Sequence, residues 1–485
     1  MIWPFRKTSK RNAVIRQPAT IARYWNAAKT DRLTGAWITE EISINKSLEY
    51  RLQTLRARAQ DMERNHPIVR RWIALLDQNV IGASGFRFQP QIPNDRDKPR
   101  YDQAANDTVE RHWKRFARNI EITGRFNLDA LCRLIMRRVA IDGEIFFLKI
   151  ARPDLEYGFT LQPIEASSLD YSLNRESENI IMGTQVDEFG RPLNYYFRKG
   201  KRRSSPEHDI IPADRIIHIC RHDFAEQQRG YPWAACVMEP LEKLAKYQEA
   251  EIVAAVTASA KMGFFTKTSP ELIGEGKTSN ETFSLDASAG TMDALPAGWG
   301  FQAWDPQHPT SAYPAFIEAK LQEVSSGLNI SYFTLANDLT KVNYTSSRTG
   351  LLEDRQYFEL LQNWIIDQFL TPVFETWLTI ALSLGRITTL TGSALPATKR
   401  EKFSQCRFQG RRWQWVDPQR EVNAAILAMQ NNLKSPIRIM SEMGIDAWDE
   451  YSDLSLANEW RNELGLKEAG QTNEQTTEET KDETE

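Results

Sequence analysis

The stretch from Pro240 to Met262 constrains the fold most, because it is rich in alanine and has no proline or glycine after its first residue. Such a composition favours one continuous helix, and Gly263 directly after it is a common residue at a helix end. At 1.5 Å per residue this helix would be about 35 Å long. Its small side chains would let neighbouring helices approach closely, so the sequence predicts a long helix that packs against others.

Other helices are predicted from apolar residues spaced three or four positions apart, as over residues 48–62. Pro67 can open a helix that ends at Gly82, and Asn127 can begin another. Pro314 starts a helix that runs to Leu328. The longest apolar-periodic helix covers about 346–384 and should be kinked at its proline, Pro372. Three short helices near the C-terminus have start signals at Asp417-Pro418, Ser435-Pro436 and Asp446, and stop signals at Gly444 and Gly465.

Between the first helices and the Ala-rich helix, the pattern changes to short β-prone runs. Asp187–Pro192 reads DEFGRP and predicts a hairpin turn in which Gly190 supplies a positive φ. A β-rich block between helical segments indicates the α+β class. The predicted strands are 144–150, 159–164, 180–186, 193–198 and 215–219.

Length and composition exclude several classes of protein. The 485 residues suggest about three domains. A net charge of -3 argues against coating nucleic acid or anionic membrane by bulk charge. No apolar run could span a bilayer, and the N-terminus lacks the apolar core of a secretory signal. Four cysteines are too few for a disulfide framework and fit a reducing compartment. The 14 tryptophans suggest large packed or subunit-burying surfaces.

The two ends of the chain carry opposite charge. Residues 1–23 contain six basic residues and no acidic one, which is compatible with an arm that touches nucleic acid or a partner and equally with a solvated start. Residues 466–485 contain seven acidic residues and two lysines, with no aromatic residue. We expect this second segment to be a disordered acidic tail, because it cannot bury enough surface to fold alone.

Two motifs suggest chemistry that the sequence does not otherwise support. Gly274–Thr278 reads GEGKT, like the end of a phosphate-binding loop, but Glu271 stands where the first glycine belongs and would repel phosphate. His218, Cys220 and His222 alternate along one predicted strand and are a conceivable metal triplet. Neighbouring side chains on a straight strand seldom converge on one ion, so we expect ordinary strand residues. We therefore expect no catalytic residues, metal or cofactor.

An ordered series of segments is more specific than any of these motifs. Together they resemble the lambda-type portal proteins of tailed bacteriophages, from about residue 20 to about residue 465. The segments are 55–85 (LRARAQDMERNHPIVRRWIALLDQNVIGASG), 142–147 (DGEIFF), 161–169 (LQPIEASSL), 186–196 (VDEFGRPLNYY), 211–218 (IPADRIIH), 228–233 (QRGYPW), 337–354 (NDLTKVNYTSSRTGLLED) and 413–418 (WQWVDP).

The resemblance implies a homo-oligomeric ring of about twelve subunits, in which each subunit presents two different complementary faces. Such a ring stands at the unique vertex of the capsid in the virion, after assembly in the host cytoplasm. It nucleates head assembly with the major capsid and scaffold proteins, docks terminase, passes double-stranded DNA without sequence preference and later joins the tail and its connector. It is not an enzyme and has no role in a membrane.

The resemblance also implies a portal fold, with a β-rich wing, a two-helix stem, a small α/β clip, a tunnel loop with a long kinked helix, and a helical crown. The expected boundaries are: basic arm 1–23, first part of the wing 24–232, stem helix 233–262, clip 263–312, second stem helix 313–335, tunnel loop 336–347, long kinked helix and second part of the wing 348–399, crown 400–465 and acidic tail 466–485.

The expected tunnel loop is mildly basic and polar, and carries no acid between Asp338 and Glu353. A conduit must hold DNA loosely, because every neutralised phosphate adds affinity. The alternative is a solvated connection with a helix N-cap at Ser346 or Ser347. The expected DNA-facing residues are Lys341, Asn343, Tyr344, Thr345, Ser346, Ser347 and Arg348.

Six arginines of the first helices are expected to form a solvated face or subunit ion pairs rather than a DNA contact. They are Arg51, Arg56, Arg58, Arg64, Arg70 and Arg71. Two other functions stay open from the residues alone. One is a DNA-processing enzyme subunit, such as a nuclease or translocase, and the other is a minor capsid scaffold that forms no ring.

Overall fold

The computed structural model describes residues 32, 38–94, 101–199, 207–259, 263–267, 299–303, 312–340, 343–413, 418–445 and 447–464. Over these ranges the chain is mostly helical with small antiparallel sheets, which confirms the α+β class. The N-terminal arm, the acidic tail, the GEGKT motif and most of the expected clip lie outside the described residues. No helix in the described part of the chain has both the length and the apolar composition needed to cross a bilayer.

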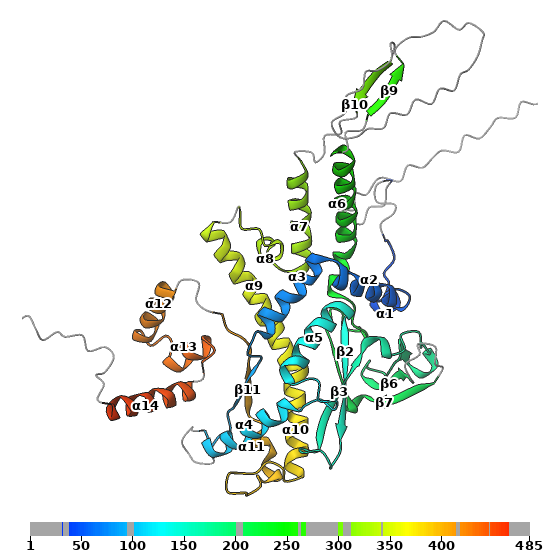
Figure 1. The fold of residues 1–485 in the computed structure, drawn as a ribbon. Coiled ribbons are helices and arrows are strands. Elements are labelled where there is room, and N and C mark those ends of the chain that lie inside the picture. Colours follow the sequence, from blue (N-terminus) through cyan, green and yellow to red (C-terminus); the bar gives the residue numbers. More distant parts are fainter. Residues whose placement is uncertain are drawn as a thin grey trace, which may run out of the picture.

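The main body combines helices and strands from both halves of the chain (Figure 1). Its helices are α1 (Ile44–Glu49), α2 (Leu52–Asn65), α3 (Pro67–Leu76), α4 (Gln103–Arg118), α5 (Leu128–Asp142), α9 (Tyr344–Ile365), α10 (Thr371–Ser383) and α11 (Arg400–Phe403). Its strands are β1 (Arg87–Pro90), β2 (Glu144–Ala151), β3 (Phe159–Glu165), β4 (Ile180–Ile181), β5 (Thr184–Val186), β6 (Pro192–Arg198), β7 (His208–Pro212), β8 (Ile216–Cys220) and β11 (Cys406–Gln409).

Two small sheets lie side by side in the body (Figure 1). One has the order β3-β2-β8 and the other the order β4-β5-β6-β7. The predicted DEFGRP turn joins β5 to β6, and Gly190 has the expected positive φ of 81°. The predicted strand 180–186 is instead a tight hairpin of β4 and β5, because Met182 and Gly183 have positive φ values of 46° and 81°. Two such residues in succession reverse the chain, as in hairpin turns.

The core of the body is rich in aromatic rings. Trp113 on α4 and Trp377 on α10 are buried, and their ring centroids lie 5.2 Å apart. Phe88 on β1 packs against Phe374 at 4.9 Å and against Phe408 of β11 at 5.2 Å. Aromatic pairs at such distances add to the free energy gained from burial. Some tryptophans therefore serve the core of a single chain.

Strand β11, in the C-terminal part of the chain, pairs with β1 of the body. Arg87 lies opposite Gln409 and Pro90 opposite Cys406, so the chain just after residue 400 belongs to the body. The boundary expected at residue 400 is therefore too early. The three predicted short helices do follow, as α12 (Pro418–Gln430), α13 (Pro436–Glu442) and α14 (Ala447–Glu463), which we call the C-terminal helical unit.

A pair of helices extends away from the body (Figure 1). They are α6 (Met238–Ser259) and α7 (Tyr313–Leu328), and the hairpin of β9 (Gly263–Lys267) and β10 (Trp299–Ala303) lies beyond their far ends. Tyr247 of α6 packs against Phe316 of α7 at 5.1 Å between ring centroids. The Ala-rich helix is thus confirmed, while the second helix ends at Leu328 and the short helix α8 (Tyr332–Ala336) follows.

The long kinked helix is also confirmed, although the irregularity precedes the proline. Helix α9 continues through the π-helical turn Ile366–Leu370 into α10, and Pro372 lies in the first turn of α10. Proline has no N–H group and its ring clashes with the preceding turn. The wider π-helical turn accommodates that clash, and the helix axis changes direction there (Figure 1).

Candidate nucleic-acid interface

The expected tunnel loop is shorter in the structure than its sequence suggests. Helix α8 ends at Ala336, Asn337 has a positive φ of 56°, and α9 begins at Tyr344. Residues Tyr344 to Ser347 therefore form the first turn of α9, and the N-cap expected at Ser346 or Ser347 is wrong. Asn343 lies directly before the helix and is exposed, while Lys341 lies outside the described residues.

The described part of this loop is organised by Asp338. One of its carboxylate oxygens accepts hydrogen bonds from Thr340 N at 3.0 Å and Thr340 Oγ1 at 2.6 Å. The other accepts a hydrogen bond from the Tyr332 hydroxyl at 3.0 Å. Leu339 between them is 66% exposed. The start of the loop therefore has a defined shape and presents its apolar residue outward.

Arg348 does not stand alone beside the loop. Its Nη2 atom lies 3.9 Å from the Oε1 atom of Glu421 on α12, and both side chains are partly exposed. A solvent-exposed pair at this distance contributes little free energy. It does show that the first turns of α9 face the C-terminal helical unit, and that one expected DNA-facing cation already has an acidic neighbour.

The arginines of the first helices divide into two groups. Arg51, Arg58, Arg64 and Arg70 are exposed, as expected for a solvated face. Arg56 is buried, contrary to the expectation, and belongs to the hydrogen-bonded network described next. Arg71 is half-buried, and its Nη2 atom lies 3.5 Å from the carbonyl oxygen of Thr334 on α8.

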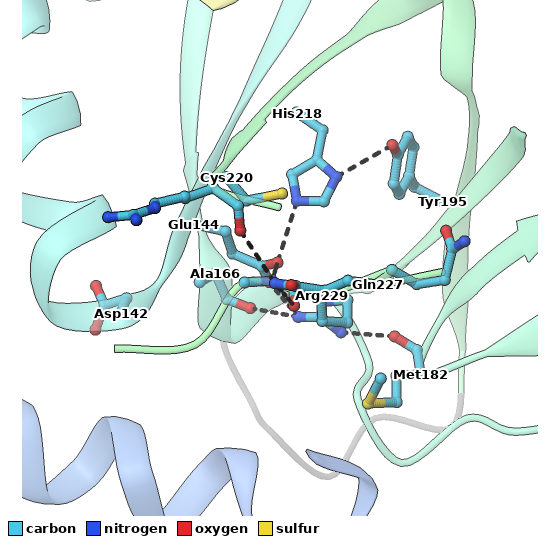
Figure 2. Close-up of polar contacts among 12 residues, drawn as sticks. Asp142, Glu144, Ala166, Met182, Tyr195, His218, Cys220, Gln227 and Arg229 are labelled. Atoms are coloured by element: carbon cyan, nitrogen blue, oxygen red, sulfur yellow. Dashed lines mark hydrogen bonds and ion pairs between the residues drawn. The ribbon is translucent and has the colours of Figure 1, made fainter. Parts of the chain in front are cut away.

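The buried network is centred on Glu144, the first residue of β2, whose side chain is fully buried (Figure 2). Its Oε1 atom accepts hydrogen bonds from Arg56 Nη2 and Arg229 Nε, both at 2.8 Å. Its Oε2 atom accepts one from Gly230 N at 2.7 Å and lies 3.1 Å from His218 Nε2. Arg229 also donates to the carbonyl oxygen of Met182 at 2.6 Å. A carboxylate buried in this way requires such partners.

Backbone geometry brings these residues together. Gly143 ends α5 with a φ of 87°, and a Cβ atom there would lie 2.3 Å from Tyr231 N. Only glycine allows the segment 229–231 to approach the start of β2 so closely. Three segments that carry the family resemblance, 142–147, 161–169 and 228–233, therefore meet at this network.

The charges in this network shift one another's pKa values. Burial alone would raise the pKa of Glu144, but the Arg229 and Arg56 guanidinium groups and His218 hold it well below its usual range. Burial would lower the pKa of His218, yet its neighbours Cys220, Tyr195 and Glu144 hold that pKa well above its usual range. Burial would raise the pKa of the Cys220 thiol, but His218 and His222 lower it to about 7.

Within the conceivable metal triplet, the Cys220 thiol interacts with both His218 and His222. His218 faces Glu144 and, through Nδ1 at 3.3 Å, the Tyr195 hydroxyl. Cys220 Sγ lies 3.5 Å from His222 Nε2. Among the described residues, no three His, Cys, Asp or Glu side chains are arranged to hold a metal ion. The geometry supports packing and charge pairing rather than coordination.

A second acidic centre lies nearby in the same half of the body. Asp170 accepts hydrogen bonds from Arg198 Nη2 at 2.5 Å and Ser172 N at 3.0 Å, and its Oδ2 atom lies 2.8 Å from His208 Nε2. Burial alone would raise the pKa of Asp170, but these hydrogen bonds hold it well below its usual range. Asp170 therefore favours the folded state only while it is ionised.

This arrangement predicts acid sensitivity. A depressed pKa in the folded state contributes stability above the unfolded pKa of about 3.9, and this contribution is lost as the pH falls through the folded pKa. We expect urea unfolding between about pH 5 and pH 2 to show a steeper loss of stability in the wild type than in Asp170→Asn. The exposed aspartate variant Asp107→Asn serves as control and should follow the wild type. Parallel curves for wild type and Asp170→Asn would contradict the assignment.

Sequence reasoning missed the network. It expected a connection over 336–347 before a long helix, and the structure has a connection between α8 and α9, while its role as a tunnel loop stays a prediction. Glu144 and Arg229 carried no signal of pairing, since they lie 85 positions apart. Their only signal was their place inside segments DGEIFF and QRGYPW, on which the resemblance rests. Of the expected DNA-facing residues, Asn343 and Arg348 flank the first turn of α9, which contains the other four described ones.

Comparison with known proteins agrees with the resemblance. Residues 30–362 match the family described as "Phage portal protein, lambda family". The "Probable portal protein" of Halomonas phage phiHAP-1 is 26% identical over 462 residues, which cover 91% of this chain and 87% of that protein. "Portal protein B" of Escherichia phage lambda is 22% identical over 477 residues, covering 89% of this chain and 88% of that protein.

Solved structures similar to this chain come from the neck of a gene transfer agent particle. The neck of the native particle computed with C12 symmetry gives a TM-score of 0.42 at 11% identity, covering 80% of this chain and 93% of that chain. The neck of the empty particle computed with C6 symmetry gives 0.40 at 14% identity, covering 81% and 93%. The match of residues 30–362 carries the assignment: the chain belongs to the lambda family of phage portal proteins, which are structural virion proteins and not enzymes.

Proposed function

We propose that this portal protein assembles into a closed ring of about twelve subunits at the unique capsid vertex and serves as a conduit for double-stranded DNA. The observation that carries the proposal is the apolar surface that a single chain leaves exposed. In the C-terminal helical unit no described residue is buried, although it holds large side chains such as Leu433, Trp448 and Trp460. Helices this apolar need neighbours that cover them.

A second apolar surface supports the same proposal. On α6, the side chains of Ile252, Val253 and Val256 are 63%, 58% and 65% exposed. They lie beyond the part of α6 that packs on α7 through Tyr247. A neighbouring subunit would cover them in a ring, because each subunit of a cyclic assembly offers two different faces to its neighbours.

We assign the portal parts to the described elements on this basis. The body with its two small sheets is the wing, α6 and α7 are the stem, and the C-terminal helical unit is the crown. The hairpin of β9 and β10 belongs to the clip, which would dock terminase during packaging and the tail connector afterwards. Contact with the major capsid and scaffold proteins would make the ring the nucleator of head assembly.

Electron microscopy of the purified protein, together with its mass in solution, tests the ring. A symmetric particle with a central channel supports the proposal. A stable monomer with metal- or ATP-dependent activity would favour a DNA-processing enzyme subunit instead. Oligomers without a channel would favour the scaffold alternative.

The DNA-facing role of the loop rests on its position between stem and crown and on its composition. Asn343 and the first turn of α9, Tyr344 to Ser347, add polar groups, while Lys341 and Arg348 add positive charge. The net charge of -3 excludes tight bulk binding only. A few cations repeated around a ring would attract the phosphates without holding them, since affinity rises with every phosphate neutralised.

Replacing both cations tests this role. We expect Lys341→Ala with Arg348→Ala to leave ring assembly intact and to reduce packaged or retained DNA by about tenfold, because two phosphate contacts per subunit are lost. The double variant Lys114→Ala with Arg115→Ala changes the charge equally at exposed positions of α4 and should package normally. Infectivity and packaged DNA length equal to the wild type in the loop variant would argue against DNA contact.

A further inference from the structure

The short helix that precedes the loop is fastened to α9 by one buried carboxylate. Asp354 is only 4% exposed. It accepts hydrogen bonds from Ser331 N at 2.8 Å, Ser331 Oγ at 2.6 Å and Thr334 Oγ1 at 2.9 Å. All three donors belong to the N-terminal end of α8, so a single side chain of α9 fixes the start of that helix.

Two further contacts hold α8 in the same place. Gly350, one turn before Asp354, packs so closely on Phe333 that a Cβ atom there would lie 2.5 Å from the ring. From the other side, Arg71 of α3 approaches the carbonyl oxygen of Thr334 to 3.5 Å. Helix α8 is therefore held between two helices of the body, and the segment that follows it starts from a fixed point.

Hydrogen bonds connect α8 to the first residues of the loop. Tyr332, in the first turn of α8, donates its hydroxyl hydrogen bond to Asp338, and Asp338 in turn orders Thr340. The contacts thus form a chain from Asp354 through α8 to Asp338. The described residues 337–340 follow α8, so any shift of α8 relative to α9 would move them as well.

We infer that Asp354 is a positioning residue that sets where the loop stands relative to α9, and hence how far it reaches toward the DNA path. The second half of this statement rests on the proposed function. The first half concerns geometry alone. Asp354 is the last residue of segment 337–354, but among the described residues its hydrogen bonds go to Ser331 and Thr334 rather than to the loop. It therefore acts on the loop by holding α8 in place.

A distance measured within one subunit tests the position of the loop relative to α9 separately from its proposed contact with DNA. Nitroxide labels at Leu339→Cys and Gln356→Cys report the loop against α9, and both positions are exposed. The exposed Cys236 is replaced by serine, Cys132 and Cys220 are buried, and burial raises the pKa of Cys406 to about 12, which slows its labelling. Mixing labelled with unlabelled chains before assembly isolates the distance within one subunit.

We expect Asp354→Ala to widen the distance distribution about twofold, because α8 loses three of the hydrogen bonds that fix it. Asp354→Asn should stay near the wild type, because an amide oxygen still accepts and the hydroxyls of Ser331 and Thr334 can accept from its NH2 group. If Asp354→Ala does not fold, Ser331→Ala with Thr334→Val removes the hydroxyl donors from the opposite side and should widen the distribution in the same direction.

The matched control is Glu121→Ala. Glu121 is also 4% exposed and accepts three hydrogen bonds, from Thr123 N, Thr123 Oγ1 and Arg125 N, but it lies in the wing. It should leave the loop distance unchanged. An unchanged distribution in Asp354→Ala, or an equal change in Glu121→Ala, overturns the inference. A widened distribution with normal DNA packaging supports the positioning role and counts against loop contact with DNA.

Discussion

Replacing Glu144 with alanine should lower the free energy of unfolding by about 3–5 kcal/mol, the range observed when one partner of a buried ion pair is removed. Arg56 would remain 7% exposed and Arg229 fully buried, each without the carboxylate that now accepts its hydrogen bonds. The Gly230 N–H group would lose its acceptor as well. Urea or thermal unfolding of the purified variant measures the loss.

Two variants show whether the loss comes from this geometry. Glu178→Ala removes an exposed glutamate that pairs with Arg175 and should change stability by no more than about 0.5 kcal/mol. Arg56→Met, Glu144→Leu and Arg229→Met together should cost less than Glu144→Ala alone, because neither arginine is then left buried without its carboxylate. A loss below about 1 kcal/mol in Glu144→Ala would show that water or rearrangement satisfies the arginines.

Local sequence signals predict those elements whose structure is determined by residues within a single short segment of chain. Asn127 accepts a hydrogen bond from Ala130 N and begins α5, and Pro67 stands in the first turn of α3. The Ala-rich stretch forms α6 within a few residues of its expected bounds. Capping residues, proline and glycine act over one turn of chain, so their effect can be read without knowing the rest of the fold.

The parts that local signals miss depend on partners far away in sequence. Strand β1 is only four residues long and exists because β11 pairs with it more than 300 positions later. Met182 takes a positive φ that is unusual for its side chain, and burial of that side chain against Leu48 and Leu52 compensates. Neither the pairing nor the compensation leaves a signature in the local residues.

The same distinction applies to the candidate site. The polar character of the loop and its place before a long helix were predictable from the run between Asp338 and Glu353. The start of α9 at Tyr344, the approach of Arg348 to Glu421 and the role of Asp354 were not, because each depends on how α8, α9 and α12 pack. The family resemblance indicated the loop before α9 as the candidate site, whereas the contacts of its residues are known only from the structure.

Placing glutamates on the exposed face of α6 should abolish ring assembly. Ile252 and Val256 are four residues apart and therefore lie on one stripe of the helix. In Ile252→Glu with Val256→Glu, closing each subunit contact would bury two carboxylates without partners, which costs several kcal/mol. A loss of about 3 kcal/mol weakens one contact more than a hundredfold, and a closed ring repeats that contact at every subunit.

The matched variant Ile252→Leu with Val256→Leu keeps the stripe apolar and should still form rings. Both variants should keep the unfolding transition of the body, because these side chains are exposed in the single chain and are not part of the buried core that the described residues form. Mass in solution then distinguishes the outcomes: monomers for the glutamate variant and rings for the leucine variant. Rings of normal mass from the glutamate variant would mean that this face of α6 stays in solvent. The subunit contact would then have to come from the apolar C-terminal helical unit, where the large side chains of Trp448 and Trp460 are exposed.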